Sequence, residues 1–199
     1  LEHDRRIDGE PPVICGGSTN GRADHHRRRV ADTGQRPAWA RYGPRAGQEN
    51  LSYLNADALK ALFLEPLEPY RDRIGPLIFE FGARSTPPRE FFAQADEFLE
   101  QLPRTFRYAV EVRNREFLQP HYFDMLKEHQ TAHVFNAWTR MPTIGEQLGQ
   151  PGVFTALHTI ARVLLRPGRE YEAAVARFQP YDRIQDPYPE GYADVARWV

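Results

Sequence analysis

The fold is decided by the stretch Leu77-Ile78-Phe79-Glu80-Phe81 and by the later stretch Tyr108-Ala109-Val110-Glu111-Val112-Arg113-Asn114. Both are short and largely apolar, and Gly75-Pro76 and Gly82 bound the first, so each predicts a buried strand. Between them apolar residues recur at helical spacing, which predicts a helix that buries Phe91, Phe92, Ala95, Phe98, Leu99 and Leu102. A strand, a helix and a strand in this order predict a parallel pair.

The same alternation continues toward the C-terminus. Further strands are predicted at Ala132–Phe135 and Ala161–Leu165, and helices at Pro120–His129, within 143–160, at Tyr171–Phe178 and at Pro189–Val199. Before the first strand, a helix capped by Asn55 should end at Pro66 and Pro69, and Thr86 should cap the helix after that strand. We therefore predict an α/β fold: a partial TIM-like β/α barrel, truncated or open, because eight such units need roughly 250 residues.

The chain divides into two regions of different pattern. Residues 1–40 are poorly patterned and are expected to form an irregular N-terminal segment, whereas 41–199 are expected to form the barrel domain. The arginine-rich stretch 21–45 leaves three interpretations open: a nucleic-acid-binding arm, a solvated segment, or sequence that is not native to the protein.

Composition limits the classes of function. The 199 residues carry 26 basic and 27 acidic side chains, a formal net charge of −1, which argues against a generally basic nucleic-acid-binding protein. The sole cysteine, Cys15, cannot form an intrachain disulfide, so a cytoplasmic location is expected. No apolar run approaches the roughly 18 residues of a membrane span, so no membrane partner is expected.

Two charged residues of the second strand are candidate catalytic residues. Strand alternation places Glu111 and Arg113 on one face, at the carboxyl end where barrel enzymes hold their active sites. A carboxylate beside a guanidinium can do acid–base work and bind anions. The alternative is a set of interior ion pairs without catalysis, and in either case we expect a further partner for each residue from Glu80 or Arg162.

Candidate ligand-binding residues follow the third and fourth strands. Asn136, Trp138 and Thr139 lie at the end of the third strand, and Arg166 follows the fourth. Trp138 could stack on a sugar or a base, or equally plug the barrel mouth, and Arg166 could clamp an anion or belong to a polar turn. No cofactor is identified and no metal site is assigned. A weaker alternative brings Glu80, Glu111 and His133 together as metal ligands.

Several of these segments together resemble a known family. Ile74–Phe81, Tyr108–Asn114 and Val134–Pro142, with Arg166–Arg169, Pro180–Asp182 and Arg41–Gln48, resemble the YecE-like proteins, known as domain of unknown function 72. The resemblance covers about residues 41–199 and implies a TIM-like β/α barrel without an established reaction. Family members usually begin with a Gly-Thr-Ser and Trp motif, which Cys15–Thr19 echoes faintly, and end with a strand bearing an Asn pair. We therefore expect the domain to be incomplete at both ends.

Three functions remain open at this point. The leading hypothesis is an enzyme-like site for an anionic ligand, phosphorylated or nucleic-acid-derived, at the carboxyl ends of the strands. The alternatives are a metal-assisted phosphoester hydrolase acting on nucleic acid and a non-catalytic binding barrel. Whether the chain is an enzyme, and its oligomeric state, are not predicted.

Overall fold

A computed structural model of the chain describes residues 50, 52–82 and 86–199. The predicted segment 1–40 and the motif at residues 41–48 therefore lie outside the described residues. No helix within the described ranges has both the length and the apolar character needed to cross a lipid bilayer.

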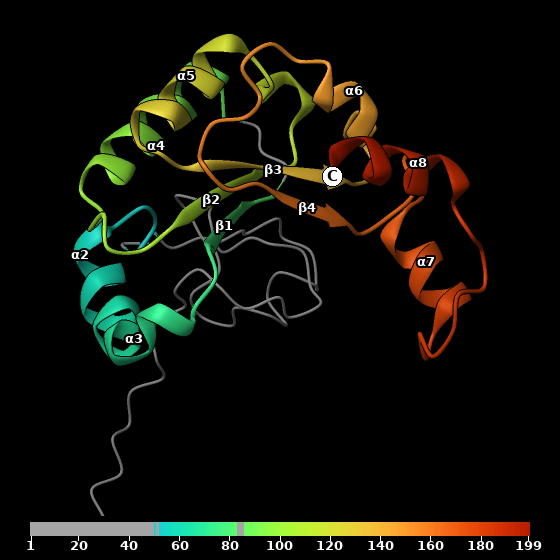
Figure 1. Cartoon of the computed structure of the whole chain (residues 1–199), viewed down its shortest axis with the longest axis horizontal. Coiled ribbons are helices and arrows are strands. Elements are labelled where there is room, and N and C mark those ends of the chain that lie inside the picture. Colours follow the sequence, from blue (N-terminus) through green and yellow to red (C-terminus); the bar gives the residue numbers. More distant parts are fainter. Residues whose placement is uncertain (1–49, 51, 83–85) are drawn as a thin grey trace, which may run out of the picture.

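The core of the molecule is a four-stranded parallel sheet of order β1-β2-β3-β4, in which sequence neighbours are also neighbours in space (Figure 1). Its strands are β1 (Leu77–Phe81), β2 (Tyr108–Val112), β3 (Ala132–Ala137) and β4 (Ile160–Val163). Between successive strands lie α4 (Pro88–Glu100), α5 (Pro120–Glu128) and α6 (Ile144–Leu148). The prediction of four parallel strands with intervening helices is confirmed. β3 extends to Ala137, two residues further than expected, and β4 begins at Ile160 and ends at Val163, short of Leu165.

The sheet has two chemically different faces. The face under α4 and α5, which we call the helix face, carries large apolar residues such as Phe79 and Phe81, and these pack edge-on against Phe98 and Phe91 of α4. The opposite face carries the small residues Ala109, Ala132 and Val134. By strand alternation it also carries Glu80, Glu111, Asn136 and Arg162, and we call it the charged face.

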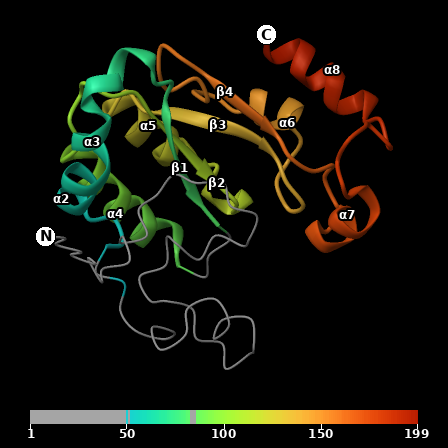
Figure 2. The same cartoon turned by 90° about the horizontal axis from the view of Figure 1, so that it is seen from below.

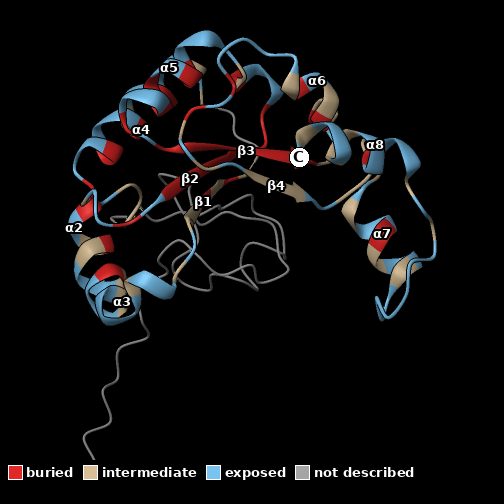
Figure 3. Ribbon diagram, in the orientation of Figure 1, coloured by how far each residue is buried: buried red, intermediate tan, exposed pale blue. Residues whose placement is uncertain are grey.

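Burial falls from the middle of the sheet toward its β4 edge. Figure 3 shows β2 and β3 buried along their whole length, whereas β4 is intermediate to exposed. Beyond β4 lie α7 (Tyr171–Phe178) and α8 (Pro189–Trp198), on the side away from α2 and α3 in both views (Figure 2). α8 packs against α6, and the Trp198 Nε1–H donates to Thr159 Oγ1 at 3.2 Å.

The helical segment before β1 differs from the prediction. Asn55 caps it as expected, since its side chain accepts from the Ala58 N–H at 2.9 Å. The prediction that Pro66 and Pro69 end the helix is wrong. The chain continues through α2 (Ala56–Leu59), a π-helical stretch (Lys60–Leu64), α3 (Glu65–Leu67) and a 3-10 helix (Glu68–Arg73). Each proline falls in the first turn of one of these helical stretches, a position at which proline is tolerated.

The start of α4 is also shifted. Thr86 was expected to cap this helix, but the cap position belongs to Pro87 and the helix begins at Pro88. A residue that precedes proline is sterically pushed out of the helical region, and Pro87 accordingly is extended, with ψ of 144°. The tandem prolines therefore fix the first residue of the helix.

Candidate functional site: a charged ring on the sheet

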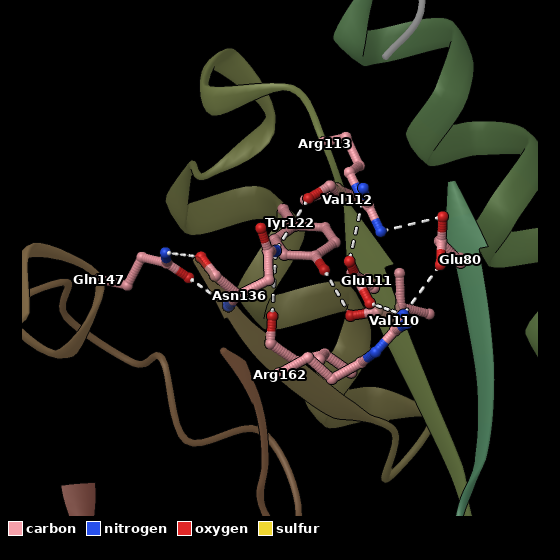
Figure 4. Close-up of polar contacts among 10 residues, drawn as sticks. Glu80, Val110, Glu111, Val112, Arg113, Tyr122, Asn136, Gln147 and Arg162 are labelled. Atoms are coloured by element: carbon pink, nitrogen blue, oxygen red, sulfur yellow. Dashed lines mark hydrogen bonds and ion pairs between the residues drawn. The ribbon is translucent and has the colours of Figure 1, made fainter. Parts of the chain in front are cut away.

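Four charged side chains on the charged face form a closed ring of ion pairs (Figure 4). Glu80 and Glu111 are register partners on β1 and β2, and two guanidinium groups bridge their carboxylates. Arg113 reaches Glu111 Oε1 at 2.9 Å and Glu80 Oε1 at 3.0 Å. Arg162 of β4 reaches Glu80 Oε2 at 2.8 Å and also bonds Glu111 Oε2. Every carboxylate oxygen of the ring therefore has a guanidinium partner, and the ring carries no net charge.

The ring has a deep end and an outer end. The exposed fraction of the side chain is 0% for Glu111 and 7% for Arg113, but 19% for Arg162 and 26% for Glu80. A buried charge must be paired to be tolerated, and Glu111 meets this demand with both guanidinium groups. Glu111 is thus the anchor of the ring, and Glu80 is its most accessible member.

Burial and charge act in opposite directions on the ionisation of the ring. Burial raises the pKa of Glu111, the charges of Arg113 and Arg162 counteract this, and the neighbouring Glu80 charge adds to the increase. For Arg162, burial lowers the pKa, but the hydrogen bonds and charges of Glu80 and Glu111 outweigh it and raise the pKa overall. The Arg162 guanidinium therefore remains charged in the folded protein.

Trp138 lies over one member of the ring. This residue directly follows β3, and the guanidinium carbon of Arg113 lies 3.7 Å from the centroid of its ring. That distance is well within the range of cation–π contacts. Tyr171, the first residue of α7, also packs against Trp138, and the two ring centroids lie 6.3 Å apart. The structure thus brings together three predicted site residues: Glu111, Arg113 and Trp138.

Asn136 lies on the same face, opposite Arg162 in the β3–β4 register. Its side chain is fully buried, and its Nδ2 donates to the carbonyls of Val112 and Val134 at 3.1 and 3.4 Å. Its Oδ1 is buried and has no hydrogen-bond partner among the described residues. An unsatisfied buried acceptor is costly, so this oxygen is suited to accept from a bound donor.

The main chain of Asn136 is held by a residue that the sequence did not single out. The buried side chain of Gln147 accepts from the Asn136 N–H at 3.2 Å and donates to the Asn136 carbonyl at 2.7 Å and to the Pro142 carbonyl at 2.8 Å. Gln147 lies on α6, which starts with a capping box between Thr143 and Glu146. The capping pattern can be read from the sequence. The contact between Gln147 and Asn136 cannot, because the sequence of a five-residue helix does not indicate which element its buried face packs against.

The remaining two predicted ligand-binding residues make other contacts. The Thr139 hydroxyl donates to the Arg169 carbonyl at 2.6 Å and ties the loop after β3 to the loop after β4. Arg166 pairs with Glu190 at 3.4 Å and lies over the Tyr188 ring at 4.8 Å. Both lie beyond the carboxyl ends of their strands, outside the charged ring.

The structure does not assemble the metal site considered as an alternative. His133 lies on the helix face, where its ring meets Phe123 and Phe135 edge-on and its Nδ1 lies 3.3 Å from the Tyr122 hydroxyl. Glu80 and Glu111 lie on the charged face, so the three side chains do not converge. In the described part of the chain, no group of three or more His, Cys, Asp or Glu side chains is arranged to hold a metal ion.

These observations define a parallel α/β protein with a charge-neutral ion-pair ring on the charged face of strands β1, β2 and β4. The chain matches the family described as protein of unknown function DUF72 over residues 25–198, and it belongs to that family. The predicted resemblance is confirmed, and the match begins at residue 25, closer to the N-terminus than the motifs that suggested it. Neither a curated protein nor a solved structure matches the chain.

Proposed function

We propose that the sheet is part of a β/α barrel and that its charged face binds an anionic ligand that also carries hydroxyl or N–H donors. Parallel strands that alternate with helices support the barrel. In such folds the carboxyl ends of the strands gather at one edge, which here bears Arg113 after β2, Trp138 after β3 and Arg166 after β4. This edge supplies guanidinium groups and an aromatic surface for a phosphorylated or nucleic-acid-derived ligand.

The observation that carries the proposal is the neighbourhood of Asn136 and Arg162. These residues are register partners on one face of the sheet. One contributes a buried acceptor without a partner among the described residues, and the other contributes a guanidinium-bearing side chain. A ligand with both an anionic group and a hydroxyl or N–H donor matches this pair. An anion without a hydroxyl or N–H group would leave the Asn136 oxygen unsatisfied.

Within this proposal Glu111 is a positioning residue. Both of its carboxylate oxygens are bound by guanidinium groups, so it has no free oxygen with which to take a proton from a ligand. It holds Arg113 and Arg162 in place, and these two guanidinium groups, with Asn136 and Trp138, provide the contacts with the ligand. This differs from the acid–base role that the strand position alone suggested for Glu111.

Thermal-shift titration tests the proposal. The probes are ribose 5-phosphate and the dinucleotide ApA, and the neutral controls are ribose and adenosine at the same ionic strength. A ligand that binds the native state raises the melting temperature with concentration. We expect a rise with at least one anionic probe, a smaller rise in Arg166→Gln, and an unchanged rise in Arg71→Gln, whose exposed ion pair with Glu68 lies in the helical segment before β1. Equal shifts with charged and neutral probes would contradict the proposal.

A further inference from the structure

We propose that the Glu80 carboxylate occupies the position of the ligand's anionic group, and that Arg113 and Arg162 form a site for a singly charged anion with two oxygens. The ligand would displace Glu80 from the two guanidinium groups, while Glu111 keeps them in place. This inference rests on the proposed function for the ligand as a whole, but the anion site itself follows from the ring.

The contacts of Glu80 are those of a bound anion. One of its oxygens lies 3.0 Å from Arg113 and the other lies 2.8 Å from Arg162, so the carboxylate bridges two guanidinium groups that come from different strands. A carboxylate or a phosphodiester has two oxygens on one atom and can make the same pair of contacts. The shared chemistry is a two-oxygen anion.

Accessibility decides which carboxylate can leave. Glu80 is the most exposed member of the ring and lies on β1, an edge strand of the described sheet. Glu111 is fully buried and lies on β2, between β1 and β3. Glu80 can therefore rotate away from the ring while the strands stay paired, whereas removing Glu111 would leave guanidinium groups without their buried partner.

Charge decides which anion fits. The ring is neutral with two guanidinium groups and two carboxylates, so a monoanion in the place of Glu80 preserves the balance. A dianion would add an uncompensated negative charge next to the buried Glu111, where low polarizability makes repulsion strong. The site should therefore prefer acetate or dimethyl phosphate to inorganic phosphate at pH 8.

The two guanidinium groups are already oriented before an anion arrives. Arg113 is fixed by Glu111 at 2.9 Å and by Trp138 above it, and Arg162 is fixed by Glu111 from the other side. Groups that are ordered in advance lose little further conformational entropy on binding. Because the entropy cost of ordering the two guanidinium groups is already met in the fold, a small monoanion can bind without a large contact area.

Chemical rescue of Glu80→Ala tests the inference in the full chain. The variant should melt at a lower temperature than the wild type, and acetate or dimethyl phosphate should raise its melting temperature at least threefold more than that of the wild type. Potassium chloride at equal ionic strength corrects for screening. The matched control is Glu68→Ala, which removes an exposed carboxylate bound to Arg71 at 2.7 Å and should show no anion-specific rise.

The comparison of the two anions identifies the source of the ligand's charge. A larger rise with dimethyl phosphate points to a phosphodiester, and a larger rise with acetate points to a carboxylic acid. If Glu80→Ala does not fold, Glu80→Gln keeps the shape of the side chain and should show the same selective rise at smaller size. Equal shifts in the variant, the wild type and the control, or equal effects of chloride, would overturn the inference.

The two proposals fail in different ways. If acetate rescues Glu80→Ala but neither ribose 5-phosphate nor ApA stabilises the wild type, the anion site stands and the proposed ligand class is wrong. If those ligands bind the wild type but no monoanion rescues the variant, Glu80 has only a structural role.

Discussion

Arg113 binds both carboxylates of the ring at once: its Nε lies 2.9 Å from Glu111 Oε1, and its terminal nitrogen lies 3.0 Å from Glu80 Oε1. The planar guanidinium provides several donors in a fixed geometry, which a lysine ammonium does not. Arg113 therefore joins the buried carboxylate of β2 to the accessible carboxylate of β1 and holds the two strands together through their side chains.

The first prediction concerns the anchor of the ring. Glu111→Gln removes the buried negative charge and leaves two guanidinium groups to share Glu80, so we expect a loss of about 3–5 kcal/mol in the free energy of unfolding. Urea unfolding at pH 7.5 measures this loss. Glu68→Gln, at an exposed ion pair, should lose less than about 1 kcal/mol. If Glu111→Gln behaved like this control, the ring would not stabilise the fold. If it lost stability but kept its affinity for the ligand, Glu111 would not position the ligand-binding guanidinium groups.

The second prediction concerns the pH dependence of stability. Burial lowers the pKa of His133 from its ordinary value of 6.5 to about 4. The unfolded chain therefore takes up a proton at a higher pH than the folded protein does. The contribution of His133 to stability is complete above the ordinary pKa and is lost as the pH falls toward the folded value, by about 2 kcal/mol between pH 7.5 and pH 5.

Urea unfolding of the wild type and of His133→Gln at these two pH values tests this prediction. The wild type should lose about 2 kcal/mol more than the variant, whereas His121→Gln, at an exposed histidine, should follow the wild type. Glu111 acts in the opposite direction, because its pKa is raised and its contribution declines as the pH rises. The difference between the wild type and His133→Gln isolates the histidine. Parallel pH profiles of the two proteins would contradict the prediction.

The third prediction concerns Gln147. Gln147→Leu keeps the apolar volume but leaves the N–H and carbonyl of Asn136 and the carbonyl of Pro142 without their side-chain partner. The two Asn136 groups are buried and the Pro142 carbonyl is half-buried. Each buried group left unsatisfied costs about 1–3 kcal/mol, so the free energy of unfolding should fall by at least about 2 kcal/mol. The matched control is Gln101→Leu, which removes an exposed bond to the Glu97 carbonyl and should change stability by less than about 1 kcal/mol. Similar losses in both variants would show that water replaces the bonds of Gln147.

The strands and half of the ring could be predicted from sequence because both depend on local rules. β1 and β2 are apolar runs between turn residues, and strand alternation alone puts Glu111 and Arg113 on one face. The expectation of further partners is confirmed, since Arg113 binds Glu80 and Glu111 binds Arg162. The direct bond between Glu111 and Arg113 joins residues whose backbones lie about 7 Å apart along the strand. At 2.9 Å it is of ordinary length, because the long side chains lean toward each other.

Other parts of the site depend on tertiary contacts that local rules do not contain. Thr139 was proposed to meet a ligand, but its hydroxyl binds the Arg169 carbonyl, thirty residues away in the sequence. The Gln147 side chain hydrogen-bonds the N–H and the carbonyl of Asn136, and nothing in the sequence around Gln147 indicates this contact. Trp138 was expected either to stack on a ligand or to plug the barrel mouth. Its sequence segment does not show that Arg113 covers one face of its ring.

The fourth prediction concerns the contact between Trp138 and Arg113. The guanidinium carbon lies 3.7 Å from the ring centroid, and the largely buried position of Arg113 limits competition from water, so the pair should contribute about 1–2 kcal/mol beyond its separate effects. A double-mutant cycle with Trp138→Leu and Arg113→Gln measures this coupling as the difference between the double variant and the sum of the single variants.

The stacking contact must be separated from the ion pairs of the same guanidinium. A second cycle with Glu80→Gln and Trp138→Leu provides the control, because Glu80 binds Arg113 but does not stack on the tryptophan. We expect this second coupling to be smaller than the first, because Glu80 and Trp138 are linked only through Arg113, their shared partner. Equal couplings in the two cycles would mean that Trp138 stabilises the ring as a whole by excluding water, and that the cation–π contact with Arg113 has no special weight.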